Sequence, residues 1–131
     1  MKLEEIVPPP ELCKLIPTGE FEDSCAAYME ATWKTEIVEL GKWITINRTT
    51  ISPIMLRKEA IALAENIHAD CKVIPAPTVA EIMEIMPYSK LKRTQNTFFF
   101  ERKHVTGAWS GGYNAAEAAL QVYFKLKGIE Y

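Results

Sequence analysis

Hydrophobic residues recur at helical spacing in several parts of the chain, and two of these runs have clear starts. They follow Thr78-Val79-Ala80-Glu81 and Asn114-Ala115-Ala116-Glu117. In both, the first side chain can accept a hydrogen bond from an unpaired N–H of the first helical turn, and the glutamate can reach back to the cap residue's own N–H. We predict helices over residues 78–86 and 115–127, the second ended by a left-handed residue at Gly128.

A third helix is predicted from Met55 to His68. Ser52-Pro53 provides a cap residue followed by a proline that suits the first helical position, and the run is rich in Ala, Leu, Glu and Lys. Its predicted buried face consists of Ala60, Ile61, Ala64 and Ile67. A short helix is also expected through Glu11–Ile16, entered from the prolines at 8–10.

Residues 24–46 fit two patterns, because some of their apolar residues follow a helical period and others alternate. We favour strands. The β-branched and aromatic residues at 35–38 and 43–46 flank Leu40-Gly41-Lys42, which is typical of a hairpin.

Further strands are predicted at Cys71–Ile74 and within residues 94–109, where Thr97–Phe100 and Val105–Trp109 have strong strand composition. Strands that alternate with helices over the second half of the chain favour an α+β fold. We predict one domain over residues 1–131, in which an antiparallel sheet is packed by about three helices.

Composition supports an ordinary globular domain, with 131 residues of which 48% are apolar and 24% charged. A chain of this size can fold without disulfides or a structural metal. Cys13, Cys25 and Cys71 are odd in number and widely spaced, which predicts a reducing, cytoplasmic setting, with Cys13 and Cys25 as small core residues. The N-terminal segment does not resemble a signal peptide, and charged or polar residues interrupt every apolar run before it reaches membrane-spanning length.

The net charge of −2 is unevenly distributed. The first 40 residues contain nine acidic and three basic side chains, whereas residues 89–104 contain five basic and one acidic. A basic segment with aromatic residues can bind nucleic acid, because the bases stack on rings while lysine and arginine neutralise phosphates. The predicted nucleic-acid-binding residues are Lys90, Lys92, Arg93, Arg102 and Lys103.

The aromatic residues around the basic segment can instead form a protein interface or a core. In a strand, Phe98 and Phe100 share one face and Phe99 lies on the other, so at least one face is expected to be buried. Aromatic residues are enriched at protein interfaces. The predicted interface residues are Tyr88, Phe99, Trp109 and Tyr113.

A third kind of site is considered at Gly111, Gly112 and Asn114, which precede the last helix. Backbone N–H groups at a helix start can bind an anion, and such a turn could support a small-anion binder or hydrolase. A plain turn is the simpler interpretation, because no glycine-rich phosphate motif is present and Asn114 with Glu117 can satisfy the same donors.

Catalytic and metal signatures are weak. His68, Asp70 and Cys71 bring three metal-ligand types together, but zinc needs three or four ligands in fixed geometry, and His104 stands apart from them. A nucleophilic cysteine, Cys71 or Cys25 with His104, has no local signature. We therefore assign no catalytic residue, metal or cofactor, and whether the protein is an enzyme stays open.

Several segments resemble a loose group of small phage and prophage proteins, many from gut Bacteroidetes and other bacteria. The similar segments are Ile74–Met83, Asn114–Leu120, the tail Lys125–Gly128, and Glu11–Pro17 with Gly19-Glu20-Phe21. The resemblance covers the N-terminal twenty residues and the last sixty, and the helix over 55–68 departs from the shorter relatives. It implies no established activity or catalytic residue.

These observations together favour a small cytoplasmic accessory protein of phage or prophage origin. It would act without enzymatic activity through contacts with a protein partner or with a second copy as a homodimer. A nucleic-acid-associated module is the alternative, and no membrane partner is expected.

Overall fold

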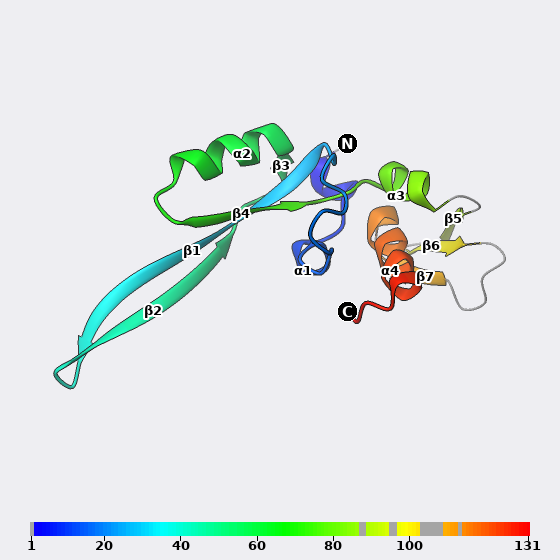
Figure 1. The fold of residues 1–131 in the computed structure, drawn as a ribbon. Coiled ribbons are helices and arrows are strands. Elements are labelled where there is room, and N and C mark those ends of the chain that lie inside the picture. Colours follow the sequence, from blue (N-terminus) through cyan, green and yellow to red (C-terminus); the bar gives the residue numbers. More distant parts are fainter. Residues whose placement is uncertain (1, 87–88, 95–96, 103–108, 113) are drawn as a thin grey trace.

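The computed structural model describes residues 2–86, 89–94, 97–102, 109–112 and 114–131 (Figure 1). After a short 3-10 turn, Leu3–Glu5, its elements are α1 (Pro10–Cys13), β1 (Ala26–Glu39), β2 (Lys42–Ile51), β3 (Met55–Leu56), α2 (Arg57–Asn66), β4 (Asp70–Pro75), α3 (Val79–Ile85), β5 (Ser89–Thr94), β6 (Thr97–Arg102), β7 (Trp109–Gly112) and α4 (Ala115–Lys127). The predicted α+β class is confirmed.

The strands form two antiparallel sheets. In the first, β1 pairs with β2 on one edge and with β4 on the other, and the short β3 adds two pairs at the start of β1. In the second, the order is β5-β6-β7. Residues 24–46 are therefore strands, as favoured, and the division into two sheets is a finer feature that the sequence pattern did not predict.

Both faces of β1 are covered in its first half. Successive side chains of a strand point to opposite faces, so Ala27, Met29 and Ala31 share one face, which packs against Ala60 of α2. On the other face, Ala26 and Tyr28 pack with residues of the N-terminal segment and β4. The Tyr28 hydroxyl donates a 2.9 Å hydrogen bond to the Pro8 carbonyl oxygen, which fixes that segment against the sheet.

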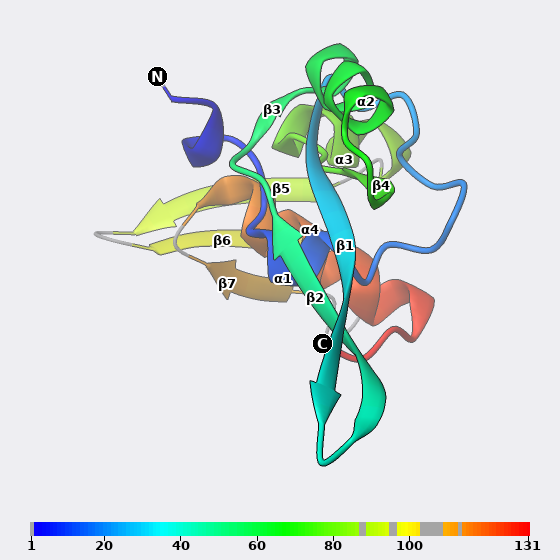
Figure 2. The ribbon, with the colours of Figure 1, turned by 90° about the vertical axis from the view of Figure 1, so that its left-hand side faces the viewer.

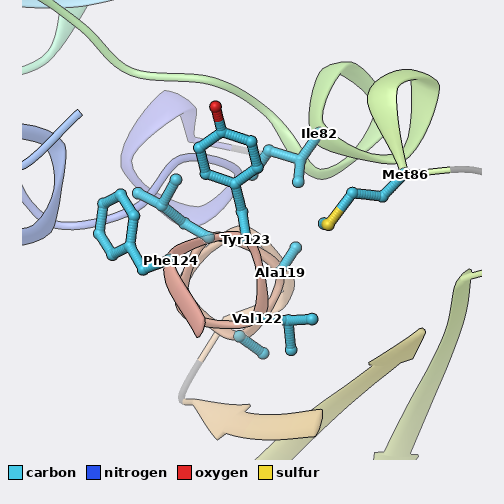
Figure 3. Packing of buried hydrophobic residues seen from close by; sticks show 8 residues of the cluster. Ile82, Met86, Ala119, Val122, Tyr123 and Phe124 are labelled. Carbon is cyan, nitrogen blue, oxygen red and sulfur yellow. The ribbon is translucent and has the colours of Figure 1, made fainter. Parts of the chain in front are cut away.

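Several of the largest fully buried side chains among the described residues belong to α4, which packs against the second sheet on one side and α3 on another (Figure 3). Phe124, Leu120 and Val122 are fully buried, together with Ile82 of α3. The ends are as predicted. Asn114 caps the first turn by accepting a hydrogen bond from the Glu117 N–H, and Gly128 takes a left-handed φ of 72° after the last turn.

The reciprocal capping box predicted for α3 is confirmed. The Glu81 N–H donates to Thr78 Oγ1 at 3.3 Å, and the Thr78 N–H donates to Glu81 Oε1 at 2.9 Å. The helix begins at Val79 and ends at Ile85, one residue before the predicted Met86.

The predicted start of the third helix is wrong. The helix begins at Arg57 rather than near Met55, because Met55 and Leu56 pair with Ala27 and Ala26 as β3. Ser52 does not cap it. Its hydroxyl accepts a 2.9 Å hydrogen bond from the Met29 N–H and donates to the Pro53 carbonyl, so it joins β2 to β1 instead.

The predicted buried face of this helix is correct in part. Ala60 is fully buried, and Ala64 and Ile67 are half-buried against β1 and β4, but Ile61 is 39% exposed. The sheet accepts a narrow stripe of mostly small residues at this position. The helix therefore leaves Ile61 and Leu63, on either side of this stripe, at the surface.

We expect Asn114→Ala to lower the free energy of unfolding by about 1–2 kcal/mol, since it removes two hydrogen bonds. The side chain caps α4 and also donates from Nδ2 to the Val7 carbonyl at 3.0 Å, which ties the N-terminal segment to the start of the last helix. Urea unfolding would measure the loss. Asn47→Ala, at an exposed position of β2, is the matched control and should change stability by less than about 0.5 kcal/mol.

Candidate interaction surface

The β1–β2 hairpin extends well beyond the rest of the molecule (Figures 1 and 2). The last β4 pair joins Asp70 to Thr32, so from Trp33 onward β1 is paired with β2 alone among the described strands. We call residues 33–48, from Trp33 through the turn to Arg48, the arm. This surface is the strongest candidate for function in the described chain.

The tip of the arm is a two-residue turn between Glu39 and Lys42, which are paired in the strand register. Leu40 and Gly41 both have positive φ values, 53° and 74°. Positive φ at both central residues is the feature of a type I′ turn, whose twist matches that of a hairpin. Leu40 is 97% exposed, so a bulky apolar side chain stands at the tip in solvent.

One face of the arm is apolar. The register pairs Ile37 with Ile44, Thr35 with Ile46, and Trp33 with Arg48, and paired residues share a face. By alternation this is the same face as that of Ala27, Met29 and Ala31, which α2 covers nearer the body. Beyond α2 the face continues without a cover in the described structure, and Trp33, Ile44 and Ile46 are 39%, 39% and 45% exposed.

The opposite face of the arm is polar along most of its length. It pairs Lys34 with Asn47 and Glu36 with Thr45, and only the pair next to the tip, Val38 with Trp43, is apolar. Trp43 is 74% exposed. The arm is therefore an amphipathic ribbon with an apolar tip.

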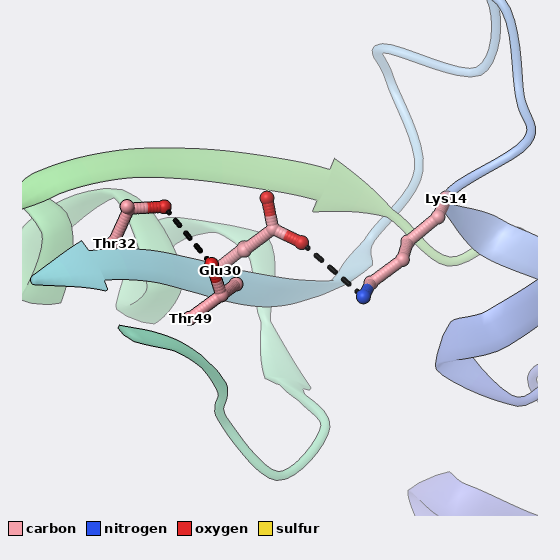
Figure 4. A network of polar contacts seen from close by, with 4 residues as sticks. All are labelled: Lys14, Glu30, Thr32 and Thr49. Carbon is pink, nitrogen blue, oxygen red and sulfur yellow. Dashed lines mark hydrogen bonds and ion pairs between the residues drawn. The ribbon is translucent and has the colours of Figure 1, made fainter. Parts of the chain in front are cut away.

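Polar contacts hold the base of the arm (Figure 4). The Thr32 and Thr49 hydroxyls lie 3.4 Å apart across the two strands, and Lys14 of the N-terminal segment forms a 3.4 Å ion pair with Glu30. On the apolar face, Trp33 Nε1 donates to Thr50 Oγ1 at 3.3 Å. The two hydroxyl contacts lie within the hairpin, and the ion pair joins β1 to the N-terminal segment.

Both edges of the arm lack a neighbour among the described strands. No described strand pairs with the outer edge of β2 or with the edge of β1 over Trp33–Glu39. A row of unpaired N–H and C=O groups is a template for pairing with another chain, and an isolated two-stranded ribbon is only marginally stable in water. The arm can thus bind a protein through its edge, its apolar face, or both.

The predicted anion-binding residues lie at the junction between β7 and α4. Gly111 and Gly112 pair with Phe99 and Phe98, and Asn114 follows as the helix cap. Both polar atoms of the Asn114 side chain already bond within the chain, to Val7 and Glu117. The predicted turn at Gly111 and Gly112 is wrong, because both residues belong to β7, and an anion site at these residues stays a prediction.

The predicted basic residues do not all occupy positions on one face of the second sheet. Lys90 and Lys92 are exposed on β5, opposite Glu101 and Phe99. Arg93 is paired with Phe98 and Arg102 with Ser89, at positions that alternate with those of Lys90 and Lys92. Lys103 lies outside the described residues.

The predicted interface residues are described only in part. Tyr88 and Tyr113 lie outside the described residues, whereas Phe99 and Trp109 lie on β6 and β7 with only their backbone described. This interface stays a prediction. The arm, in contrast, was predicted as a hairpin but not as a binding surface.

Metal and nucleophile chemistry gain no support from the described residues, in which no group of three or more His, Cys, Asp or Glu side chains is arranged to hold a metal ion. His68 and Asp70 line an open hollow of about 460 Å³ with Trp33 and Lys34, beside the start of β4. Cys71 is half-buried, and His104 lies outside the described residues. The expectation that Cys25 lies in the core is wrong, since it is exposed at the start of β1, while Cys13 is buried as expected.

We expect stability to fall as the pH rises from about 9 to 12. Burial, with a smaller effect of Glu11, raises the pKa of the Cys13 thiol from 9.0 to about 12. Between these values the unfolded chain loses a proton that the folded chain keeps, which favours unfolding. Urea midpoints at pH 8 and pH 10.5 would show the decrease. Cys13→Ala should reduce it, and an equal decrease in that variant would contradict the assignment.

An acidic hollow of about 610 Å³ lies between residues 19–24, α3 and α4, and its carboxylates come from Glu20, Glu22, Asp23, Glu81 and Glu84. Part of this charge is used within the fold. Glu20 accepts a hydrogen bond from the Tyr123 hydroxyl and lies 3.7 Å from Lys127 Nζ. Burial, and then the hydrogen bond to Glu20, raise the pKa of Tyr123. The contacts of Glu20 join the 19–24 loop to the last helix.

Comparison of the chain with protein-family models, with curated proteins and with solved structures gave no match. Functional inference therefore rests on the sequence and on the geometry above. Within the described residues, none of the helices has both the length and the apolar character that crossing a bilayer requires.

Proposed function

We propose that this protein is a small, non-enzymatic accessory protein of the cytoplasm that acts by binding protein through the arm. One observation carries the proposal. The apolar face that α2 covers on the first half of β1 continues outward on a two-stranded ribbon, where the described chain leaves it uncovered and leaves both ribbon edges unpaired. A surface that is apolar on one face and open at its edges has the properties of a contact site.

The arm offers both apolar area and unpaired backbone groups to a contact. Burying what remains exposed of Trp33, Ile37, Ile44 and Ile46 would contribute roughly 1 kcal/mol for each side chain. Edge pairing would add backbone hydrogen bonds at about 0.5–1.5 kcal/mol each. The two together approach the roughly 8 kcal/mol of a micromolar complex, before the costs of association are subtracted.

The phage or prophage setting comes from the resemblance of the N-terminal and C-terminal segments. It supports an accessory role, because the similar proteins have no established catalytic residues to transfer. The nucleic-acid alternative depends on the basic residues of β5 and β6, where the exposed Lys90 lies opposite the acidic Glu101.

We expect Ile37→Thr combined with Ile44→Thr to abolish partner capture while lowering the thermal midpoint by only a few degrees. These residues form one cross-strand pair on the apolar face, and threonine keeps the strand preference of the arm. Tagged protein would be used to capture partners from host lysate, with and without nuclease. Ile85→Thr, at an exposed position of α3, is the control and should leave capture unchanged.

Equal capture by the arm variant and the native chain would contradict the proposal. Loss of the captured partner on nuclease treatment would instead favour the nucleic-acid alternative.

A further inference from the structure

We propose that the arm binds a second copy of this chain, through antiparallel pairing of the free edges of the two β1 strands about a twofold axis at Thr35. The inference rests on the proposed function of the arm as a contact surface, and it names the partner and the register of the contact. It follows from the pattern of free edges and charges along the arm.

The free edge of β1 begins beyond the last residue that β1 pairs with β4. On this edge Thr32 is paired with Asp70, and no described strand pairs with the seven residues Trp33–Glu39. A closed dimer needs the same edge from both copies, related by twofold symmetry. A twofold axis perpendicular to the sheet keeps the apolar faces of both copies on the same side. Because directly opposite residues share a face, the axis must then pass between two copies of the same residue, so that one residue of β1 lies opposite itself in the second copy.

Centring the pairing on Thr35 gives complementary contacts on both faces. On the apolar face, Trp33 lies opposite Ile37 of the second copy. On the polar face, Lys34 lies opposite Glu36 of the second copy. Symmetry doubles each contact, so the five central residues form two apolar pairs, two ion pairs and a threonine pair, all of which stabilise antiparallel strands.

Neighbouring registers lack this complementarity. Centring on Lys34 places two lysines opposite each other, and centring on Glu36 places two glutamates opposite each other and Trp33 opposite Glu39. The other free edge, that of β2, contains Lys42 and Arg48 but no acidic residue, so its self-pairing forms no ion pair within the strand. Charge therefore selects the β1 edge and the Thr35 register.

The charges involved are available for the contact. Lys34 and Glu36 are exposed, their neighbours across the hairpin are the uncharged Asn47 and Thr45, and no ion pair joins either of them to another described residue. In the proposed register, Val38 of the second copy reaches the level of Thr32, where Asp70 already occupies the edge. An open hollow of about 460 Å³, lined by Lys34, His68 and Asp70 among others, lies at this level, and the chain of the second copy must turn away there.

Charge exchange tests the proposal. Sedimentation velocity on the full chain at 1–200 µM in low salt should show a dimer for the native protein. Lys34→Glu and Glu36→Lys should each weaken dimerisation at least tenfold, because each places like charges opposite one another at two sites. An equimolar mixture of the two variants should restore the dimer, since every facing pair then has opposite charges, and the double variant K34E/E36K should restore it within one chain.

Control substitutions are Lys58→Glu and Glu84→Lys, both at exposed positions away from the arm, which should leave the dimer unchanged. Circular dichroism would establish whether each single variant is folded. If a single variant does not fold, the double variant K34E/E36K still tests the proposal, because it restores both ion pairs between copies of one chain. A monomeric native chain at every concentration would overturn the proposal. So would a dimer that resists either single change, or single variants that fail to recover on mixing.

The failure of this inference and the failure of the proposed function are distinguishable. A monomeric native chain whose captured partner is lost in the I37T/I44T variant would overturn the dimer and leave the arm as a contact surface for another protein. A monomeric native chain whose partner capture is also unchanged in that variant would overturn both.

Discussion

Phe124→Ala should lower the free energy of unfolding by about 3–5 kcal/mol, which is a large part of the stability of a domain of this size. Phe124 is fully buried in α4, and its ring centroid lies 6.2 Å from that of Tyr123 and 6.0 Å from that of Tyr131. The variant would lose the transfer free energy of the ring and leave a cavity beside α4. Urea unfolding followed by circular dichroism would measure the loss.

Two further variants make this measurement specific. Phe124→Leu, which fills more of the site, should cost less than the alanine variant. Leu40→Ala removes an equally apolar side chain from the tip of the arm, where it is 97% exposed, and should change the free energy of unfolding by less than about 0.5 kcal/mol. A loss below about 1 kcal/mol for Phe124→Ala would contradict the described core.

Shortening the arm should abolish association and leave the body folded. Glu36 and Thr45 are a cross-strand pair, so an Asn-Gly turn can replace residues 37–44 and close the hairpin in the native register. The replacement removes Ile37 and Ile44 of the apolar face and the whole exposed tip. The buried residues of the three core clusters lie outside the removed segment.

Thermal unfolding and sedimentation velocity would be measured on the same sample of the shortened chain. We expect a thermal midpoint within about 5 °C of the native value, because few contacts with the body are lost, together with at least a hundredfold weaker association. A collapse of the thermal midpoint would show that the arm belongs to the core. Unchanged association would place the contact elsewhere.

Helix ends were predictable where the signal is local. Asn114 and Gly128 mark α4, and Thr78 with Glu81 marks α3, because each cap is made by residues within one turn. The start of α2 was mispredicted for the opposite reason. Ser52 bonds to Met29, which lies 23 residues away, and no local pattern reveals that bond.

The arm shows a second limit of the sequence pattern. The alternation around Gly41 predicted a hairpin, and Leu40-Gly41 forms its turn. A strand whose apolar face is covered and one whose apolar face is open to solvent show the same alternation. The exposure of Ile44 and Ile46 depends on α2, which covers only the first half of β1, and the alternation does not show this. The aromatic interface around Phe99 and Trp109 stays a prediction.

The most direct test of the arm as a contact surface is backbone hydrogen exchange measured by mass spectrometry. Exchange rates would be compared between the free chain in dilute solution and the chain in complex with its protein partner or a second copy. We predict slower exchange in residues 33–48 of the complex, strongest over Trp33–Glu39, and unchanged exchange in the buried helix α4. Protection confined to β5 and β6, with an arm that exchanges equally fast in both samples, would contradict the account.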